Sequence, residues 1–130
     1  MKKLLLATLF GGVGMWVLGG LWHNLIMANL YEKTHATHDG VAVLLLANLI
    51  LALMMSYLYD RISKKGSYIW EGIKFGAFIG LLWVFPHGLA MVGAHDASLI
   101  YLIKNSAWHI VEQGFGGLII AFVYDKVKRL

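Results

Sequence analysis

The stretch IWEGIKFGAFIGLLWVFPHGLAMVG, residues 69–93, decides the fold of this chain. Its only charged side chains, Glu71 and Lys74, lie within its first six residues. A run of about 20 mostly apolar residues is long enough to cross the hydrocarbon core of a bilayer as a helix. Lipid offers no partner for backbone N–H and C=O groups, so the segment must satisfy them itself, which a helix does. The stretch therefore predicts a transmembrane helix.

Three further apolar stretches of similar length cover residues 4–30, 41–59 and 105–124. Hydrophobic residues make up 59% of the 130-residue chain and charged residues 14%, where a soluble domain carries about 25% charged residues. A chain of this length has room for one small domain. We therefore predict an all-α fold, a single transmembrane domain over residues 1–130 built as an antiparallel bundle of four transmembrane helices in the lipid bilayer.

Basic residues are distributed unequally between the two ends of these predicted helices. Only Lys33 and Lys104 fall on one side. The other side carries Lys2, Lys3, Arg61, Lys64, Lys65, Lys74, Lys126, Lys128 and Arg129. Lysine and arginine are enriched on the cytoplasmic side of membrane proteins. We expect a multi-pass protein of the inner (plasma) membrane with both termini in the cytoplasm, whose net charge of +4 faces lipid headgroups and not nucleic acid.

The two halves of the chain resemble each other after a shift of 65 residues. The shift superposes Phe10-Gly11 on Phe75-Gly76, Asn48 on Gln113, and residues 59–62 on residues 124–127. A tandem pair of helical hairpins, related as a parallel repeat, would produce this pattern. A tyrosine followed by an acidic and a basic residue is also an ordinary ending for a membrane helix, so chance similarity is the alternative.

Glycines recur every four residues on the third predicted helix, at Gly72, Gly76 and Gly80. Small residues at this spacing let two membrane helices approach closely. The first and fourth helices are also rich in glycine. We expect close packing both within the bundle and between subunits, so the partners would be a second copy of the chain or other membrane subunits.

Polar residues interrupt the apolar stretches at one depth. His23, Asn48, His87, His109 and Glu112 each fall roughly 6–10 Å below the outer end of their helix, at about 1.5 Å per residue. All four helices contribute to this layer. The pattern predicts an outward-facing polar site.

The His109–Glu112 pair is the centre of the predicted site, because an ionisable residue within a membrane span marks a functional site by default. Three residues apart, the two lie on one helix face. With His23 and His87, they would suit a divalent transition metal such as Zn²⁺, Cu²⁺ or Fe²⁺, or a proton relay. The structural alternatives are that His23 is interfacial beside Trp22, and that His87 bonds carbonyls freed by a kink at Pro86.

Two other functional classes are compatible with the same residues. His23 with His87 or His109 could ligate a b-type haem, although few basic residues lie nearby to pair with the haem propionates. Alternatively the chain is a structural accessory subunit of a larger respiratory or transport complex, and the polar layer is a packing device. The absence of cysteine excludes thiolate sites, and no catalytic motif is present, so we do not expect an enzyme.

The motifs Gly19-Gly20-Leu21-Trp22, Glu71-Gly72 with the glycine stripe, and Phe85-Pro86 give the chain a family resemblance. It resembles a family of small four-helix integral membrane proteins of bacteria and archaea, catalogued as a domain of unknown function. The resemblance implies the four-helix membrane fold and assigns no functional residue. His87, His109 and Glu112 are not part of the family pattern.

Overall fold

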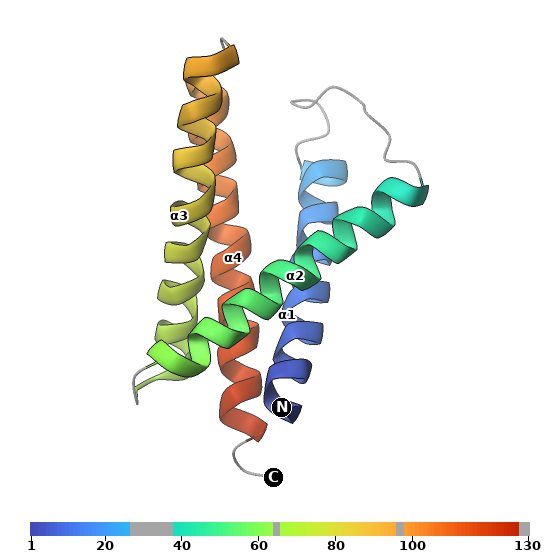
Figure 1. The fold of residues 1–130 in the computed structure, drawn as a ribbon, viewed down its shortest axis with the longest axis vertical. Coiled ribbons are helices and arrows are strands. Elements are labelled where there is room, and N and C mark those ends of the chain that lie inside the picture. Colours follow the sequence, from blue (N-terminus) through green and yellow to red (C-terminus); the bar gives the residue numbers. More distant parts are fainter. Residues whose placement is uncertain (27–37, 64–65, 96–97, 128–130) are drawn as a thin grey trace.

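The computed structural model describes residues 1–26, 38–63, 66–95 and 98–127, and these form helices throughout. Their order is α1 (Lys2–Leu21), a π-helical turn η1 (Trp22–Ile26), α2 (His38–Ile62), α3 (Tyr68–His95) and α4 (Leu99–Val127). The helices pack as a bundle in which both ends of the chain lie at the same end (Figure 1). The predicted all-α fold is confirmed.

Each of the four helices is long and apolar enough to cross a membrane, so the protein is a small multi-pass membrane protein. The helices exceed the predicted apolar stretches: α3 continues to His95, and α4 begins at Leu99 instead of residue 105. The residues that extend α4 are mostly apolar, and Lys104, which precedes the predicted start, does not interrupt the backbone hydrogen bonding of the helix. Leu102 N–H, for example, donates to Ser98 O at 3.0 Å.

Helix α4 is the centre of the bundle. Residues buried inside the protein make up 56% of its most apolar window, compared with 17–22% for the other three spans. Helix α3 runs beside α4, whereas α2 crosses the bundle diagonally in front of α1 (Figure 1). The core joins α1, α2 and α4 and has an apolar centre, formed by Ala7, Met15, Ala52, Met55, Tyr59, Ile120, Ala121, Val123 and Tyr124.

The predicted glycine stripe of α3 is a seam against α4. A Cβ atom added to Gly72 would lie 2.7 Å from the carbonyl oxygen of Gly117, and one added to Gly80 would lie 2.5 Å from that of His109. A Cβ at Gly76 would collide with the carbonyl of Gln113. These are contacts to backbone, which cannot rotate aside. The structure thus confirms that the stripe of α3 packs against another helix at close range.

The two predicted hairpins are similar only in part. Tyr59 and Tyr124, related by the 65-residue shift, lie ring to ring with 5.6 Å between centroids. The related glycines have different contacts, since a Cβ added to Gly11 would lie 2.9 Å from Cγ1 of Ile120, whereas one added to Gly76 would collide with the Gln113 carbonyl. In addition, α1 packs extensively on α4, whereas the equivalent pair α3 and α2 touch little. The parallel repeat therefore stays a prediction.

Gly76→Ala is expected to destabilise the bundle by about 1–3 kcal/mol, because the new methyl group must push α3 away from α4. Gly114→Ala is the matched control across the same seam, where an added Cβ finds only ordinary contacts of 3.7–3.9 Å. Thermal unfolding in detergent measures the stability of both variants. Equal transition temperatures for the two variants would contradict the close seam.

The predicted orientation places the α2–α3 connection in the cytoplasm and the α3–α4 connection outside. Ser67 and Ser98 are exposed at these two connections, and the chain has no cysteine of its own. In intact cells a membrane-impermeant maleimide should label Ser98→Cys and should label Ser67→Cys only after permeabilisation. The reverse pattern would show that the orientation is inverted.

Candidate functional site

A buried carboxylate hydrogen-bonds to a histidine within α4. Nδ1 of His109 and Oε2 of Glu112 lie 2.8 Å apart, and Gln113 Nε2 donates to the same oxygen at 3.3 Å. Glu112 is only 5% exposed, and Gln113 1%. The three-residue spacing puts the His109 and Glu112 side chains on one face of the helix, as the sequence predicted. The two groups lie within ion-pairing distance of each other.

Two glycines on neighbouring helices make room for this pair. On the α1 side, a Cβ atom added to Gly19 would lie 2.8 Å from Oε1 of Glu112. On the α3 side, Gly80 lies against the backbone carbonyl of His109. The carboxylate thus reaches into the contact between α1 and α4 because Gly19 has no side chain. A larger residue at either glycine would move the pair.

Three tryptophan rings lie on the segments near the pair. Trp108 stacks on Trp22 with 4.1 Å between ring centroids and an interplanar angle of 8°. The ring of Trp83 meets the His109 imidazole edge-on at 5.0 Å. These rings come from α4, η1 and α3, and the Trp83 ring contacts the pair directly.

The π-helical turn η1 begins at Trp22, directly after Gly19-Gly20-Leu21. Single π turns within membrane helices alter the direction of side chains and occur frequently at functional sites. Here the turn carries Trp22 onto Trp108 and His23 to within 6.5 Å of the same ring. The Asn24 amide donates to Gly20 O at 2.8 Å and satisfies one of the carbonyls near the turn.

Several buried polar atoms on the walls of the site have no hydrogen-bond partner among the described residues. They are Nε1 of Trp22, Oγ of Ser106, Nε1 of Trp108 and Oε1 of Gln113. An unsatisfied buried donor or acceptor costs about 1–3 kcal/mol. The region around Glu112 thus has unused hydrogen-bonding capacity for water or another polar species.

The other predicted site residues lie around this pair without completing a metal site. His23 is exposed on η1 and within electrostatic reach of Glu112 and His109. His87 is exposed on α3, one turn beyond Trp83. No group of three or more histidine and acidic side chains able to hold a metal ion occurs in the described part of the chain. The four-residue metal site of His23, His87, His109 and Glu112 stays a prediction.

Asn48 is the remaining residue of the predicted layer, and the histidines not yet described belong to the ends of the helices or to the outer loops. Asn48 donates its amide to Leu44 O at 3.0 Å within its own helix. His95 is exposed at the end of α3. The loop residues His35 and Asp96, and the side chains of His38 and Asp39, lie outside the described residues.

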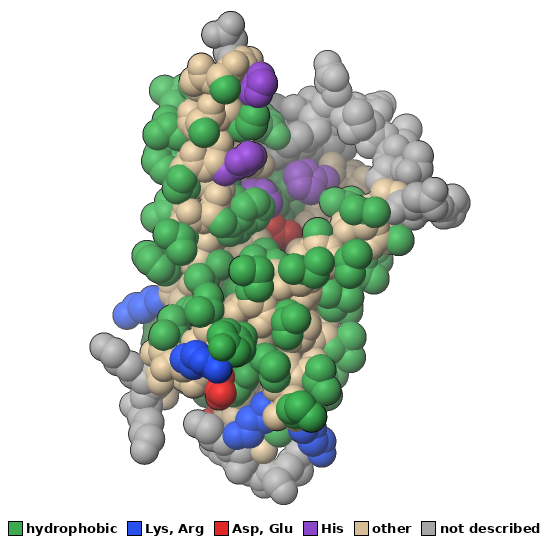
Figure 2. Space-filling model, viewed as in Figure 1, with side chains coloured by type: hydrophobic (Ala, Val, Ile, Leu, Met, Phe, Trp, Pro, Cys, Tyr) green, Lys and Arg blue, Asp and Glu red, His purple; other side chains and the backbone are tan. Residues whose placement is uncertain are grey.

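Charge and histidine separate along the visible face of the bundle. Histidine side chains gather in the half away from the chain ends, with an acidic side chain among them, while lysine and arginine lie in the other half (Figure 2). On this face of the folded protein, the histidines are therefore separated from the basic residues.

The sequence analysis did not predict the tryptophan contacts near the pair or the role of Gly19. Trp108 lies four residues before Glu112, so helical spacing could have placed it on the helix face that carries Glu112. Trp22 and Gly19 could not be assigned, because their contacts depend on how α1 crosses α4 and on the π turn.

No protein family matches the chain, and no curated protein or solved structure matches it either. The family resemblance noted from the motifs is supported at the level of architecture, since the chain is a small membrane protein of four long apolar helices. The site is therefore interpreted from its own geometry.

Gly19→Ala should move the Glu112 carboxylate with little loss of stability, because the new methyl group meets the end of a flexible side chain. The displaced Oε1 would strain the bond between Oε2 and His109. We expect the pH dependence of tryptophan fluorescence, which reports on the rings around His109, to shift relative to the wild type.

Gly20→Ala is the matched control, since nothing lies within 4 Å of its added Cβ. Superimposable pH profiles for Gly19→Ala and the wild type would show that the carboxylate does not rest against Gly19.

Proposed function

We propose that this membrane protein binds and releases protons at the His109–Glu112 pair. The observation that carries the proposal is the 2.8 Å hydrogen bond between an imidazole and a carboxylate that is almost wholly buried within a membrane span. Ionisable residues at such depth are costly to insert and are kept mainly for function.

The pair is suited to proton binding because one shared proton makes it neutral overall. Either the carboxylic acid donates to a neutral imidazole, or an imidazolium donates to the carboxylate. With no proton or with two, the pair carries a net charge in surroundings that disfavour one. We therefore propose that the two groups exchange protons as one unit.

A change in the charge of the pair would act on the contact between α1 and α4. Oε1 of Glu112 lies at Gly19 of α1, and the Trp22–Trp108 stack closes the same contact. Water stabilises a charged pair by hydrating it, and water that enters at the pair would loosen this contact. Proton uptake and helix packing are thus coupled, as a proton-responsive module requires.

The architecture favours proton binding or sensing over passage across the membrane. Between Glu112 and the end of the bundle that carries the chain ends, the core is filled mainly by apolar side chains such as Met15, Met55 and Ile120, all fully buried. Protons move along polar groups and water, so this packing opposes a continuous path.

The metal-binding role is the alternative for the same pair, and it requires His23 and His87 to move onto it. The haem-binding role and membership of a larger complex or homo-oligomer rest on the sequence alone. The pair itself provides two of the ligands that a metal would need, so metal addition belongs in the test.

Infrared difference spectroscopy between acidic and alkaline pH tests the proposal in protein reconstituted into lipid. We expect a protonated-carboxyl band that disappears in Glu112→Gln and shifts in His109→Gln, whose amide cannot become cationic. Glu71→Gln, which alters a carboxylate in the first turn of α3, is the control and should keep the band. A band that survives Glu112→Gln would refute the assignment.

Zinc ions added to the same sample distinguish proton binding at the pair from metal coordination by it. Under the proton proposal, micromolar zinc leaves the pH profile of the Glu112 band unchanged. Metal coordination would lower the affinity for protons, since both ligands must be deprotonated, and would shift the profile to lower pH.

A further inference from the structure

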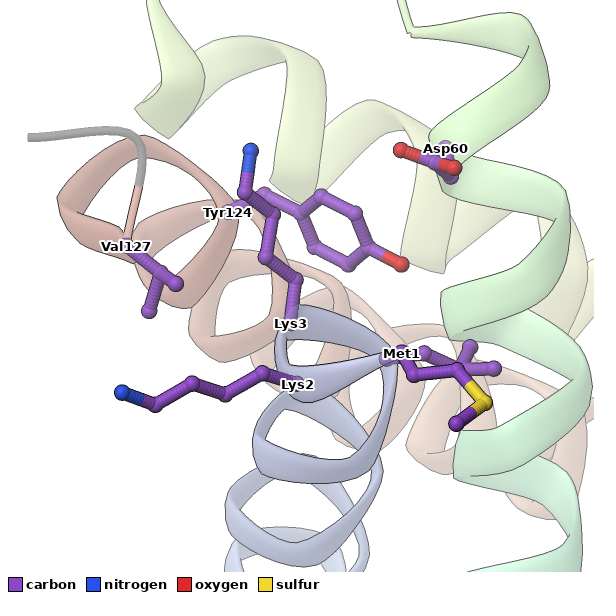
Figure 3. A pocket seen from close by; sticks show the side chains of 7 residues that line it. Met1, Lys2, Lys3, Asp60, Tyr124 and Val127 are labelled. Carbon is purple, nitrogen blue, oxygen red and sulfur yellow. The ribbon is translucent and has the colours of Figure 1, made fainter. Parts of the chain in front are cut away.

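A second site lies at the opposite end of the bundle, where the chain ends are found. It is an open depression of about 310 Å³ between the first turn of α1, the end of α2 and the end of α4. Its lining residues are Met1, Lys2, Lys3, Leu4, Asp60, Tyr124 and Val127, which Figure 3 shows from close by. Nothing in this depression contributes to the His109–Glu112 pair.

Charges of both signs border the depression without being paired. Within the described residues, Lys2, Lys3 and Asp60 form no ion pair. In Figure 3 the Lys3 ammonium rises beside Tyr124, while the Asp60 carboxylate lies beyond the Tyr124 ring on α2. The depression therefore offers cationic groups on one side and an anionic group on the other.

Neighbouring basic side chains are already engaged. The Arg61 guanidinium lies 3.4 Å from the centroid of the Tyr57 ring and donates to Tyr57 O at 3.1 Å. Lys126 lies over the Phe122 ring at 5.5 Å. The Tyr124 hydroxyl donates to Ser56 O at 3.0 Å, which fixes the ring that separates Lys3 from Asp60.

The side chains of Met1, Leu4 and Val127 are apolar, and the depression lies at the ends of three membrane-spanning helices. Lipid headgroups are found at this level, with glycerol and acyl groups directly beneath. Leu4 and Val127 are suited to contact those apolar groups. Basic pockets between transmembrane helices are known to bind phospholipid headgroups.

We propose that the depression binds the headgroup of phosphatidylethanolamine. The lysines receive the phosphate, and Asp60 accepts hydrogen bonds from the ethanolamine ammonium. A purely anionic headgroup would leave Asp60 opposed to a like charge, and phosphatidylcholine carries no N–H donor for it. The inference does not depend on the function proposed for His109 and Glu112.

Binding of individual lipids to the full chain in detergent, followed by native mass spectrometry, tests the proposal. Phosphatidylethanolamine should bind more tightly than phosphatidylglycerol or phosphatidylcholine. Lys3→Gln should weaken binding of all three lipids about fivefold, because each carries the phosphate that Lys3 receives and one basic residue near a membrane surface contributes about that much. Asp60→Asn should weaken phosphatidylethanolamine alone and remove its preference over phosphatidylglycerol.

Lys74→Gln is the matched control, because Lys74 is an exposed basic residue of α3 outside the depression. It should bind all three lipids as the wild type does. Thermal unfolding without added lipid should be the same for the three variants, so that weaker binding is not loss of fold. Soluble phosphoethanolamine, which lacks the glycerol and acyl groups, should not compete at millimolar concentration.

Three results would overturn the proposal. Equal losses in Lys74→Gln and Lys3→Gln would show that only the general surface charge attracts lipid. A preference for phosphatidylethanolamine that survives Asp60→Asn would show that Asp60 does not bind the ethanolamine ammonium. Competition by soluble phosphoethanolamine at the affinity of the lipid would identify a soluble ligand instead of a membrane lipid.

Discussion

The close approach of α3 to α4 is the constraint on which the rest of the structure depends. In lipid, helices gain no hydrophobic energy by associating, so they depend on shape and on close backbone contact. Gly72, Gly76 and Gly80 provide that contact along three successive turns. The resulting seam makes α4 the best-buried helix, and the other helices are arranged around it.

The polar site is a consequence of this arrangement. Gly80 places α3 against the backbone of His109, which brings Trp83 onto the imidazole. Gly19 allows α1 to lie against the Glu112 carboxylate, and the Trp22–Trp108 stack connects η1 to α4 nearby. The glycines that allow the helices to pack therefore also position the His109–Glu112 pair. This gives a physical reason for protonation and helix packing to influence each other.

Most of the architecture was predictable because the membrane leaves few choices. Apolar length fixed the number of spans, and the glycine spacing of α3 identified the seam before its partner was known. The three-residue spacing of His109 and Glu112 also placed them side by side on one face of the helix. Each of these predictions depends only on local sequence and on the solvent.

The rest depends on how helices cross, which local sequence does not encode. The oblique course of α2 explains why Asn48, predicted in the same layer, bonds within its own helix instead of joining the site. The π turn at Trp22 and the contact of Gly19 with Glu112 likewise follow from the α1–α4 crossing. The depth count that grouped His23 and His87 with the pair carried no information on direction around each helix axis.

The most direct test of the account is a solid-state NMR distance measurement in lipid between the side-chain carboxyl carbon of Glu112 and the labelled Nδ1 of His109. The account predicts strong dipolar coupling, matching the 2.8 Å separation of Nδ1 and Oε2. Absence of coupling, with a Glu112 carboxyl signal that responds to a lipid-soluble paramagnetic probe, would place the carboxylate on the lipid face and contradict the account.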